Sequence, residues 1–194
     1  MKNQEAEGLL SPLIKKIRLK KAAKCIQNNS TVLDIACGAG YLRQFLPSQC
    51  KYYGIDRITP PSLNLFNAFL QLDILQPKSF ETIKEWLPEP KVDVVTMLAF
   101  IEHIKNPQYL LKQSLLLLKP NGLLIITTPH PIGRKLHDSL AKLYLCSLSG
   151  AKEHENFFGQ QDLKFLLKQS GYKLLSYQRF LMGLNQLIIA TPLK

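Results

Sequence analysis

The stretch from Val32 to Gly40 reads VLDIACGAG, and it predicts a buried strand that runs directly into a glycine turn. Apolar and partly β-branched residues surround one acid, Asp34, and Gly38 and Gly40 then precede a helical pattern that begins at Tyr41. A strand, a glycine turn and a helix in this order are typical of loops that hold nucleotide-type cofactors. The rest of the chain is therefore interpreted around this loop.

Strand patterns alternate with helix patterns on both sides of the loop. Strands are expected at residues 31–36, 51–56, 68–73, 92–98 and 123–128, and helices at residues 41–46, 79–87 and 107–118. The sequence Lys-Pro-Asn-Gly at 119–122 is expected to end the last of these helices. Because strand, helix and strand follow one another, the strands should pair in parallel, which predicts an α/β doubly wound sheet.

The C-terminal part adds an expected helix at 162–169 and two strands, at 172–180 and near 186–191, that should form an antiparallel hairpin at one sheet edge. With these two strands, the predicted sheet is mostly parallel and has seven strands.

The 194 residues suit one domain. Its expected parts are a basic helical segment (1–30), a cofactor-binding core (31–130), a cap over the acceptor site (131–160) and the C-terminal helix and hairpin (161–194). An apolar helix is expected at 136–148, and it either packs against the core or forms a lid over the site of an apolar acceptor.

Composition and charge indicate a globular protein with an unusually basic surface. The net charge is +11, and many of the basic residues gather in one predicted helix: Lys15, Lys16, Arg18, Lys20, Lys21 and Lys24. Such a helix can be a solvated surface helix, or it can approach anionic membrane or nucleic acid. No apolar run is long enough to span a bilayer, and the first residues do not resemble a secretory signal, so a cytoplasmic location is expected.

The four cysteines are Cys25, Cys37, Cys50 and Cys146, and none of them forms a C-x-x-C pair. Neither a zinc site nor a disulfide framework is therefore indicated, and reduced thiols are expected.

Two cofactor classes use a strand, a glycine turn and a helix in this way, namely dinucleotides and S-adenosylmethionine. A dinucleotide loop requires a third glycine where this chain has Arg43, whose long side chain would crowd the pyrophosphate. In addition, Asp34 would repel a pyrophosphate but would suit an ammonium group. The loop is therefore interpreted as a seat for the amino-acid end of a cofactor.

With an acid followed by G-x-G after the first strand, residues 32–129 resemble the class I S-adenosylmethionine-dependent methyltransferases. The resemblance implies S-adenosylmethionine as cofactor, Asp56 on its ribose hydroxyls and Asp73 on its adenine amine. The other cofactor-binding residues expected in this way are Asp34, Ala36, Cys37, Gly38, Gly40, Arg57, Ile74 and Leu98. Taken one at a time, Asp34 could cap a loop, Asp56 could start a turn and Asp73 could cap a helix.

The loop after the fourth predicted strand contains Glu102 and His103 and resembles the Glu-His segment of small-molecule methyltransferases such as those of quinone biosynthesis. The acid that such enzymes commonly carry at the position of Ala99 is absent, so no metal is assigned. His103 is either a general base or a helix cap. His130 follows the fifth strand and should point into the same crevice, as a pocket residue or as a passive part of a proline turn.

The leading hypothesis is an enzyme that moves a methyl group from S-adenosylmethionine to a small molecule, with oxygen favoured over nitrogen or carbon as the accepting atom. One alternative is a cofactor-binding protein that serves as a regulatory or scaffolding subunit without transferase activity. A basic nucleic-acid methyltransferase is the other alternative, although its Pro-Pro-Tyr signature is missing after the fourth strand.

Overall fold

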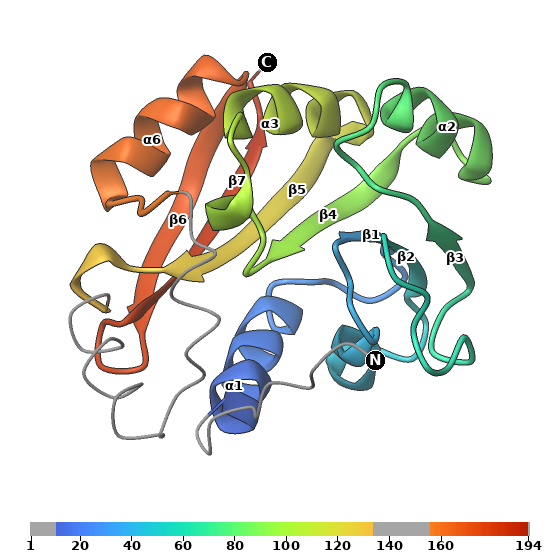
Figure 1. Cartoon of the computed structure of the whole chain (residues 1–194), viewed down its shortest axis with the longest axis horizontal. Coiled ribbons are helices and arrows are strands. Elements are labelled where there is room, and N and C mark those ends of the chain that lie inside the picture. Colours follow the sequence, from blue (N-terminus) through green and yellow to red (C-terminus); the bar gives the residue numbers. More distant parts are fainter. Residues whose placement is uncertain (1–10, 134–155, 194) are drawn as a thin grey trace, which may run out of the picture.

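In the computed structural model, which describes residues 11–133 and 156–193, seven strands form one sheet (Figure 1). They are β1 (Thr31–Ile35), β2 (Lys51–Asp56), β3 (Ala68–Gln71), β4 (Val92–Leu98), β5 (Leu118–Pro129), β6 (Tyr172–Phe180) and β7 (Asn185–Pro192). Their order is β3-β2-β1-β4-β5-β7-β6. The first five strands pair in parallel, whereas β7 runs antiparallel to β5 and β6. The predicted α/β fold, with its antiparallel C-terminal hairpin at one edge, is confirmed.

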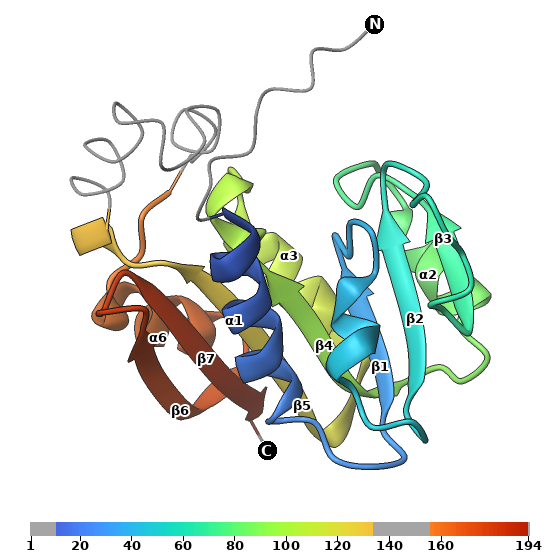
Figure 2. The same ribbon diagram turned by 90° about the horizontal axis from the view of Figure 1, so that it is seen from below.

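Helices cover both faces of this sheet (Figures 1 and 2). The helix α1 (Ser11–Ala23) and the 3₁₀ helix η1 (Tyr41–Phe45) lie on one face, and α2 (Ser79–Trp86), α3 (Pro107–Leu116) and α6 (Gln160–Gln169) lie on the other. A second 3₁₀ helix, η2 (Ile101–His103), follows β4. Side chains alternate along the strands, so Val94 packs toward α1 while Val95 and Met97 join the larger core beneath α2, α3 and α6.

The segment after the glycine loop differs from the α-helix expected there. It forms only the five-residue η1, and the Arg43 guanidinium donates hydrogen bonds to the carbonyl oxygens of Pro47, Ser48 and Cys50. Pro47 leaves no room for a longer helix, and Arg43 instead closes the turn that follows. Because this side chain is occupied there, the steric argument that it would crowd a pyrophosphate was wrong.

The segment 119–122 also differs from its expected role as a helix end. Helix α3 already ends at Leu116, and these residues lie within β5. Pairing shifts from Val92 opposite Leu118 to Val94 opposite Leu123, so four residues of β5 leave the regular register.

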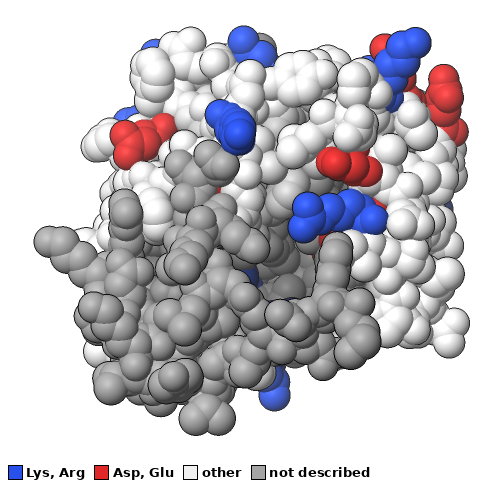
Figure 3. Space-filling view, viewed as in Figure 1, with Lys and Arg blue, Asp and Glu red and all other residues white. Residues whose placement is uncertain are grey.

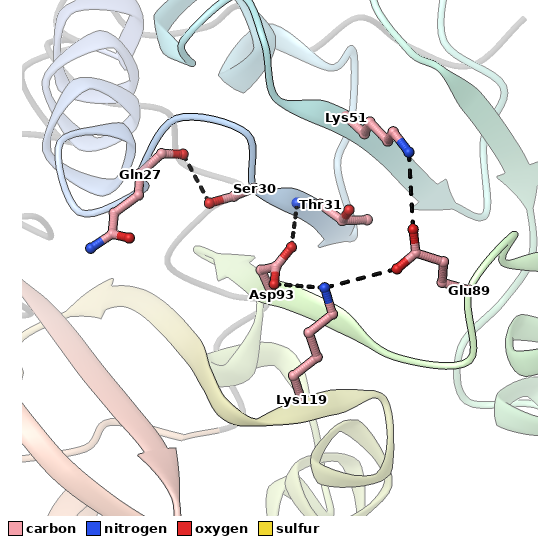
Figure 4. A network of polar contacts seen from close by, with 7 residues as sticks. All are labelled: Gln27, Ser30, Thr31, Lys51, Glu89, Asp93 and Lys119. Atoms are coloured by element: carbon pink, nitrogen blue, oxygen red, sulfur yellow. Dashed lines mark hydrogen bonds and ion pairs between the residues drawn. The ribbon is translucent and has the colours of Figure 1, made fainter.

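A network of charges holds this irregular part of β5 at the N-terminal edge of the parallel strands (Figure 4). Asp93 accepts hydrogen bonds from Lys119 Nζ and from the Thr31 amide, each at 2.8 Å. Glu89 lies 3.8 Å from Lys119 and 3.9 Å from Lys51. Partial burial raises the pKa of Asp93, but the hydrogen bonds from Lys119 and Thr31 outweigh that effect and lower the pKa overall. Lys119 therefore ties β5 to β1 and β4 instead of capping α3.

The basic helix α1 packs on the sheet through Ala22 and Ala23, which are both buried. Three of its lysines lie over aromatic rings. The distances from Nζ to the ring centroid are 4.5 Å from Lys15 to Tyr41, 5.8 Å from Lys20 to Phe45 and 5.6 Å from Lys21 to Phe180. Binding of this helix to membrane or nucleic acid stays a prediction. Among residues 11–133 and 156–193, no helix has the length and apolarity that crossing a membrane requires.

The ring of Phe66 fills the space that two glycines leave beside the glycine loop. It stacks on Tyr52 with ring centroids 5.0 Å apart. A Cβ atom would lie 2.3 Å from this ring at Gly40 and 2.2 Å from it at Gly54, where Cys37 Sγ would also be only 2.8 Å away. The ring therefore supports the loop from its outer side.

We expect Gly54→Ala to lower the free energy of unfolding by about 2 kcal/mol, because the added methyl group overlaps the packed ring. Chemical denaturation of this variant, of Phe66→Leu and of the double variant measures the effect. The smaller leucine should relieve the overlap, so the double variant should lose less stability than the sum of the single variants. Additive losses would show that Phe66 does not restrict this position.

Candidate active site

A cavity of about 710 Å³ opens at the C-terminal ends of the parallel strands, a volume typical of sites for small ligands. Its walls come from four segments, within 36–39 after β1, 55–61 from the end of β2, 72–75 after β3 and 100–104 after β4. Because β1 pairs with β2 on one side and with β4 on the other, the cavity lies where the strand order reverses. Figure 3 shows a hollow on the face that Figure 1 presents, with acidic and basic side chains beside it.

Asp56, the last residue of β2, links the glycine loop to the far wall of the cavity. Its Oδ2 atom accepts a hydrogen bond of 2.8 Å from the Gly38 amide, and its Oδ1 atom accepts one of 3.0 Å from the Ile58 amide. Each carboxylate oxygen has a second lone pair, so Asp56 can accept two further hydrogen bonds from a ligand in the cavity.

Asp73 lines the same cavity from the loop two residues beyond β3. Its Oδ1 atom accepts a hydrogen bond of 3.0 Å from the Leu75 amide, and its carbonyl oxygen accepts one from the Gln76 amide. The side chain therefore shapes a turn and also presents a carboxylate to the cavity. It does not cap a helix, as its alternative interpretation had it, because the N-cap residue of α2 is Lys78.

Two alanines next to the cavity have backbone conformations that favour glycine. Ala36, directly after β1, has φ 57°, and Ala99, directly after β4, has φ 56°. A left-handed conformation costs a non-glycine residue roughly 1–2 kcal/mol, and such strain is concentrated at functional sites. The ends of the two central strands are therefore shaped for the cavity at some expense of stability.

Six of the ten residues expected to bind the cofactor line the cavity: Ala36, Gly38, Asp56, Arg57, Asp73 and Ile74. The other four do not. Cys37 packs beneath the loop against Gly54, Gly40 lies against Phe66, and Leu98 packs in the apolar cluster under α1. Burial raises the pKa of the Cys37 thiol, and the nearby Asp34 and Asp56 carboxylates raise it further.

Asp34 is buried inside the sheet, only 3% exposed, and it is not among the residues that line the cavity. Its two carboxylate oxygens accept hydrogen bonds of 2.5 Å from Tyr52 Oη and from Thr96 Oγ1, which belong to the neighbouring strands. Burial raises its pKa from 3.8 to about 6, although both hydrogen bonds favour the ionised form. The expected direct contact with an ammonium group stays a prediction.

The two histidines differ in position. His103 lines the cavity, as expected. His130 does not: its Nδ1 atom accepts a hydrogen bond from the Ile132 amide, and its own amide donates one to the Leu184 carbonyl in the turn between β6 and β7. Burial lowers the pKa of His130, and the charge of Arg179 lowers it further. His130 therefore does not line this cavity, because pairing of β5 with β7 places it beside the hairpin, and a catalytic role for it stays a prediction.

Several cavity residues carried no signal in the sequence. They are Ala39, Ile55, Thr59, Pro60, Pro61, Leu72, Leu75, Phe100 and Ile104. Most are neighbours of the predicted acids along the chain, and only that adjacency could have indicated them. The apolar helix expected at 136–148 lies outside the residues that the structure describes. Within 11–133 and 156–193, no three His, Cys, Asp or Glu side chains form a group that could hold a metal ion.

Comparison with known proteins assigns the family. A family model described as a methyltransferase domain matches residues 5–177. The chain belongs to the methyltransferase-domain family. The chain is 33% identical over 101 residues to a ubiquinone biosynthesis O-methyltransferase of Bradyrhizobium diazoefficiens. This alignment covers 50% of the chain and 39% of the relative. A protein of the same name from Klebsiella pneumoniae is 27% identical over 155 residues, covering 75% of this chain and 58% of the relative.

Solved structures of other methyltransferases share the fold of this family member. The 1,6-didemethyltoxoflavin-N1-methyltransferase of Burkholderia thailandensis, with bound 1,6-didemethyltoxoflavin and S-adenosylhomocysteine, superposes with a TM-score of 0.69 at 16% identity. That match covers 95% of this chain and 82% of the other. A SAM-dependent methyltransferase from Aquifex aeolicus gives a TM-score of 0.64 at 19% identity, covering 94% of this chain and 98% of the other. The matched region spans only 39–44% of the first curated relatives.

Proposed function

We propose that the cavity binds S-adenosylmethionine and that the protein transfers the methyl group to an oxygen atom of a small molecule. The observation that carries this proposal is the meeting of Gly38, Asp56 and Asp73 on one cavity at the ends of three successive strands. Membership of the methyltransferase-domain family supports it independently.

The cavity walls offer a complementary partner for each part of S-adenosylmethionine. The ribose hydroxyls donate to the remaining lone pairs of Asp56, and the exocyclic amine of adenine donates to Asp73. Ile58 and Ile74 provide apolar surface for the purine ring, and the backbone at 36–39 receives the methionyl end. This order along the cavity directs the sulfonium toward β4 and the loop that carries Phe100 and His103.

Transfer of a methyl group from a sulfonium is a displacement, so holding the acceptor in line with the methyl group supplies most of the rate. His103 and Phe100 line the cavity beside the end of β4, where an acceptor would approach. The curated relatives quoted above are O-methyltransferases by name, which favours oxygen as the accepting atom.

Calorimetric titration with S-adenosylmethionine and with NAD, followed by an acceptor screen that detects S-adenosylhomocysteine, tests the proposal. We expect saturable binding of S-adenosylmethionine, no comparable binding of NAD and turnover with at least one hydroxylated acceptor. Preferential binding of NAD would refute the cofactor assignment. Cofactor binding without turnover of any acceptor would instead favour a regulatory or scaffolding role.

A further inference from the structure

The wall of the cavity that follows β4 is bound by one residue from the C-terminal part of the chain, Asn156. Its backbone amide donates a hydrogen bond of 2.9 Å to the carbonyl oxygen of Glu102. Its side-chain Nδ2 atom donates one of 2.7 Å to the carbonyl oxygen of Ile104, 52 positions earlier in the chain. The two acceptors lie on either side of His103, which lines the cavity. Asn156 therefore holds the main chain before and after a cavity residue.

The loop that Asn156 binds has little regular structure of its own. The 3₁₀ helix η2 has only three residues, and the His103 amide donates to the Phe100 carbonyl at 3.0 Å. The Ile104 amide donates to the Ile101 carbonyl at 3.2 Å. Such turns have poorer hydrogen-bond geometry than an α-helix. Ala99, at the start of the loop, has the left-handed φ of 56°. Contacts from outside the loop are therefore needed to fix its conformation.

The segment that carries Asn156 is itself well anchored. The carbonyl oxygen of Phe158 accepts a hydrogen bond of 2.7 Å from Nε2 of Gln186, a fully buried residue of β7. The Oε1 atom of Gln186 in turn accepts one of 2.8 Å from Tyr177 Oη on β6. Beyond Phe158 the chain enters α6 (Figure 1). A chain of hydrogen bonds thus connects the C-terminal hairpin to the loop after β4.

Asn156 is not among the residues that line the cavity. Any effect it has on a bound molecule must therefore pass through the loop that it holds. A wall that is already ordered in the free protein binds a ligand more tightly, because no conformational entropy is lost when the ligand arrives. The amide of Asn156 suits this task, since its Nδ2 atom can donate to a carbonyl oxygen whereas a carboxylate could only accept.

We propose that Asn156 is a positioning residue, which holds the loop after β4 in the conformation that presents His103 to the sulfonium end of the cofactor. This inference rests on the proposed binding of S-adenosylmethionine in the cavity. The backbone hydrogen bond fixes the loop before His103, and the side-chain hydrogen bond fixes it after His103.

Amide hydrogen exchange of the ligand-free protein measures the hold on the loop directly. Asn156→Ala removes the side-chain hydrogen bond to Ile104. We expect the amides of His103 and Ile104 to exchange about tenfold faster in this variant, the factor that the loss of one ordinary hydrogen bond supports. Tyr177→Phe is the matched control, because it removes one hydrogen bond from the neighbouring network without touching η2. It should leave both amides unchanged. Unchanged exchange of both amides in Asn156→Ala would overturn the inference.

Calorimetric titration with S-adenosylhomocysteine measures the consequence for the cavity. We expect Asn156→Ala to bind it about tenfold more weakly than the wild type. Asn156→Asp preserves the size of the side chain but removes the donor, so it should lose at least as much affinity. Gln161→Ala removes an exposed amide of α6 and should keep the wild-type Kd. Affinities of both Asn156 variants within about twofold of the wild type would contradict the inference.

A double-mutant cycle separates the positioning of His103 from a general loosening of the protein. His103→Ala removes the side chain that the loop presents. If Asn156 acts through it, Asn156→Ala should weaken binding of S-adenosylhomocysteine less in the His103→Ala background than in the wild type. An equal loss in both backgrounds would refute the action through His103. Circular dichroism shows whether each variant is folded.

Failure of this inference differs from failure of the proposed function. A wild type that binds neither S-adenosylmethionine nor S-adenosylhomocysteine would refute the proposed function, and with it the placement of His103 against the cofactor. Hydrogen exchange would then still decide whether Asn156 holds the loop. Normal binding by the wild type and by both Asn156 variants would refute this inference alone and leave the proposed cofactor intact.

Discussion

Replacement of Asp56 by alanine should lower the affinity for S-adenosylmethionine by about a hundredfold, or roughly 2.7 kcal/mol. A hydrogen bond to a charged group contributes about 1.5–3 kcal/mol, and the ribose offers two donors to this carboxylate. The change also releases the amides of Gly38 and Ile58, which Asp56 holds at 2.8 and 3.0 Å. The glycine loop then loses its link to the opposite wall. Isothermal titration calorimetry measures the loss.

Two further variants define the cause of that loss. Asp56→Asn keeps the size of the side chain and one acceptor oxygen, so its affinity should fall between those of the wild type and Asp56→Ala. Glu81→Ala removes an exposed carboxylate of α2 outside the cavity and should leave the Kd unchanged. An affinity of Asp56→Ala within about threefold of the wild type would remove Asp56 from the binding site.

Asp34→Asn should stabilise the protein near neutral pH and have little effect in acid. The pKa of Asp34 is about 6 in the folded protein, against an ordinary value of 3.8. Between these values the folded state holds a proton that the unfolded state has released, so stability falls as pH rises from about 4 to 6. The loss is about 3 kcal/mol for a shift of roughly two units. Asparagine has no charge to bury, and its amide can bond both Tyr52 and Thr96.

Urea denaturation at pH 4 and pH 7.5 measures this difference. The two proteins should be nearly equal at pH 4, whereas Asp34→Asn should be more stable by up to about 3 kcal/mol at pH 7.5. Glu81→Gln should retain the wild-type pH profile. Equal stability of Asp34→Asn and the wild type at both pH values would show that burial does not perturb Asp34. Calorimetry on the same variant tests whether the Asp34 charge attracts a cationic cofactor.

The strands were predicted from the sequence more accurately than the segments that connect them. The limits of β2 and β4 match their observed positions, because Lys51–Asp56 and Val92–Leu98 combine apolar and β-branched residues with clear ends. In contrast, the segment 119–122 contains Pro and Gly and was expected to end a helix. Its place in β5 depends on the contact of Lys119 with Asp93, a tertiary interaction that local propensity does not contain.

The part of the cavity that the ends of successive strands form could be predicted from the sequence. Asp56 and Asp73 reach it because parallel strands end at one edge of the sheet. The electrostatic interaction between Arg18 of α1 and Glu102 of η2 was not predictable, because the two residues lie far apart in the sequence and approach each other only when α1 packs on the sheet. The position of His130 beside the hairpin was not predicted either, because no local pattern indicates that β7 inserts between β5 and β6.

A crystal structure of the protein with S-adenosylhomocysteine is the most direct measurement of the central claim. We expect the ribose hydroxyls within hydrogen-bonding distance of Asp56, the adenine amine near Asp73 and the sulfur directed toward the loop after β4. Binding of the product outside this cavity, or with its adenosine away from both carboxylates, would contradict the account.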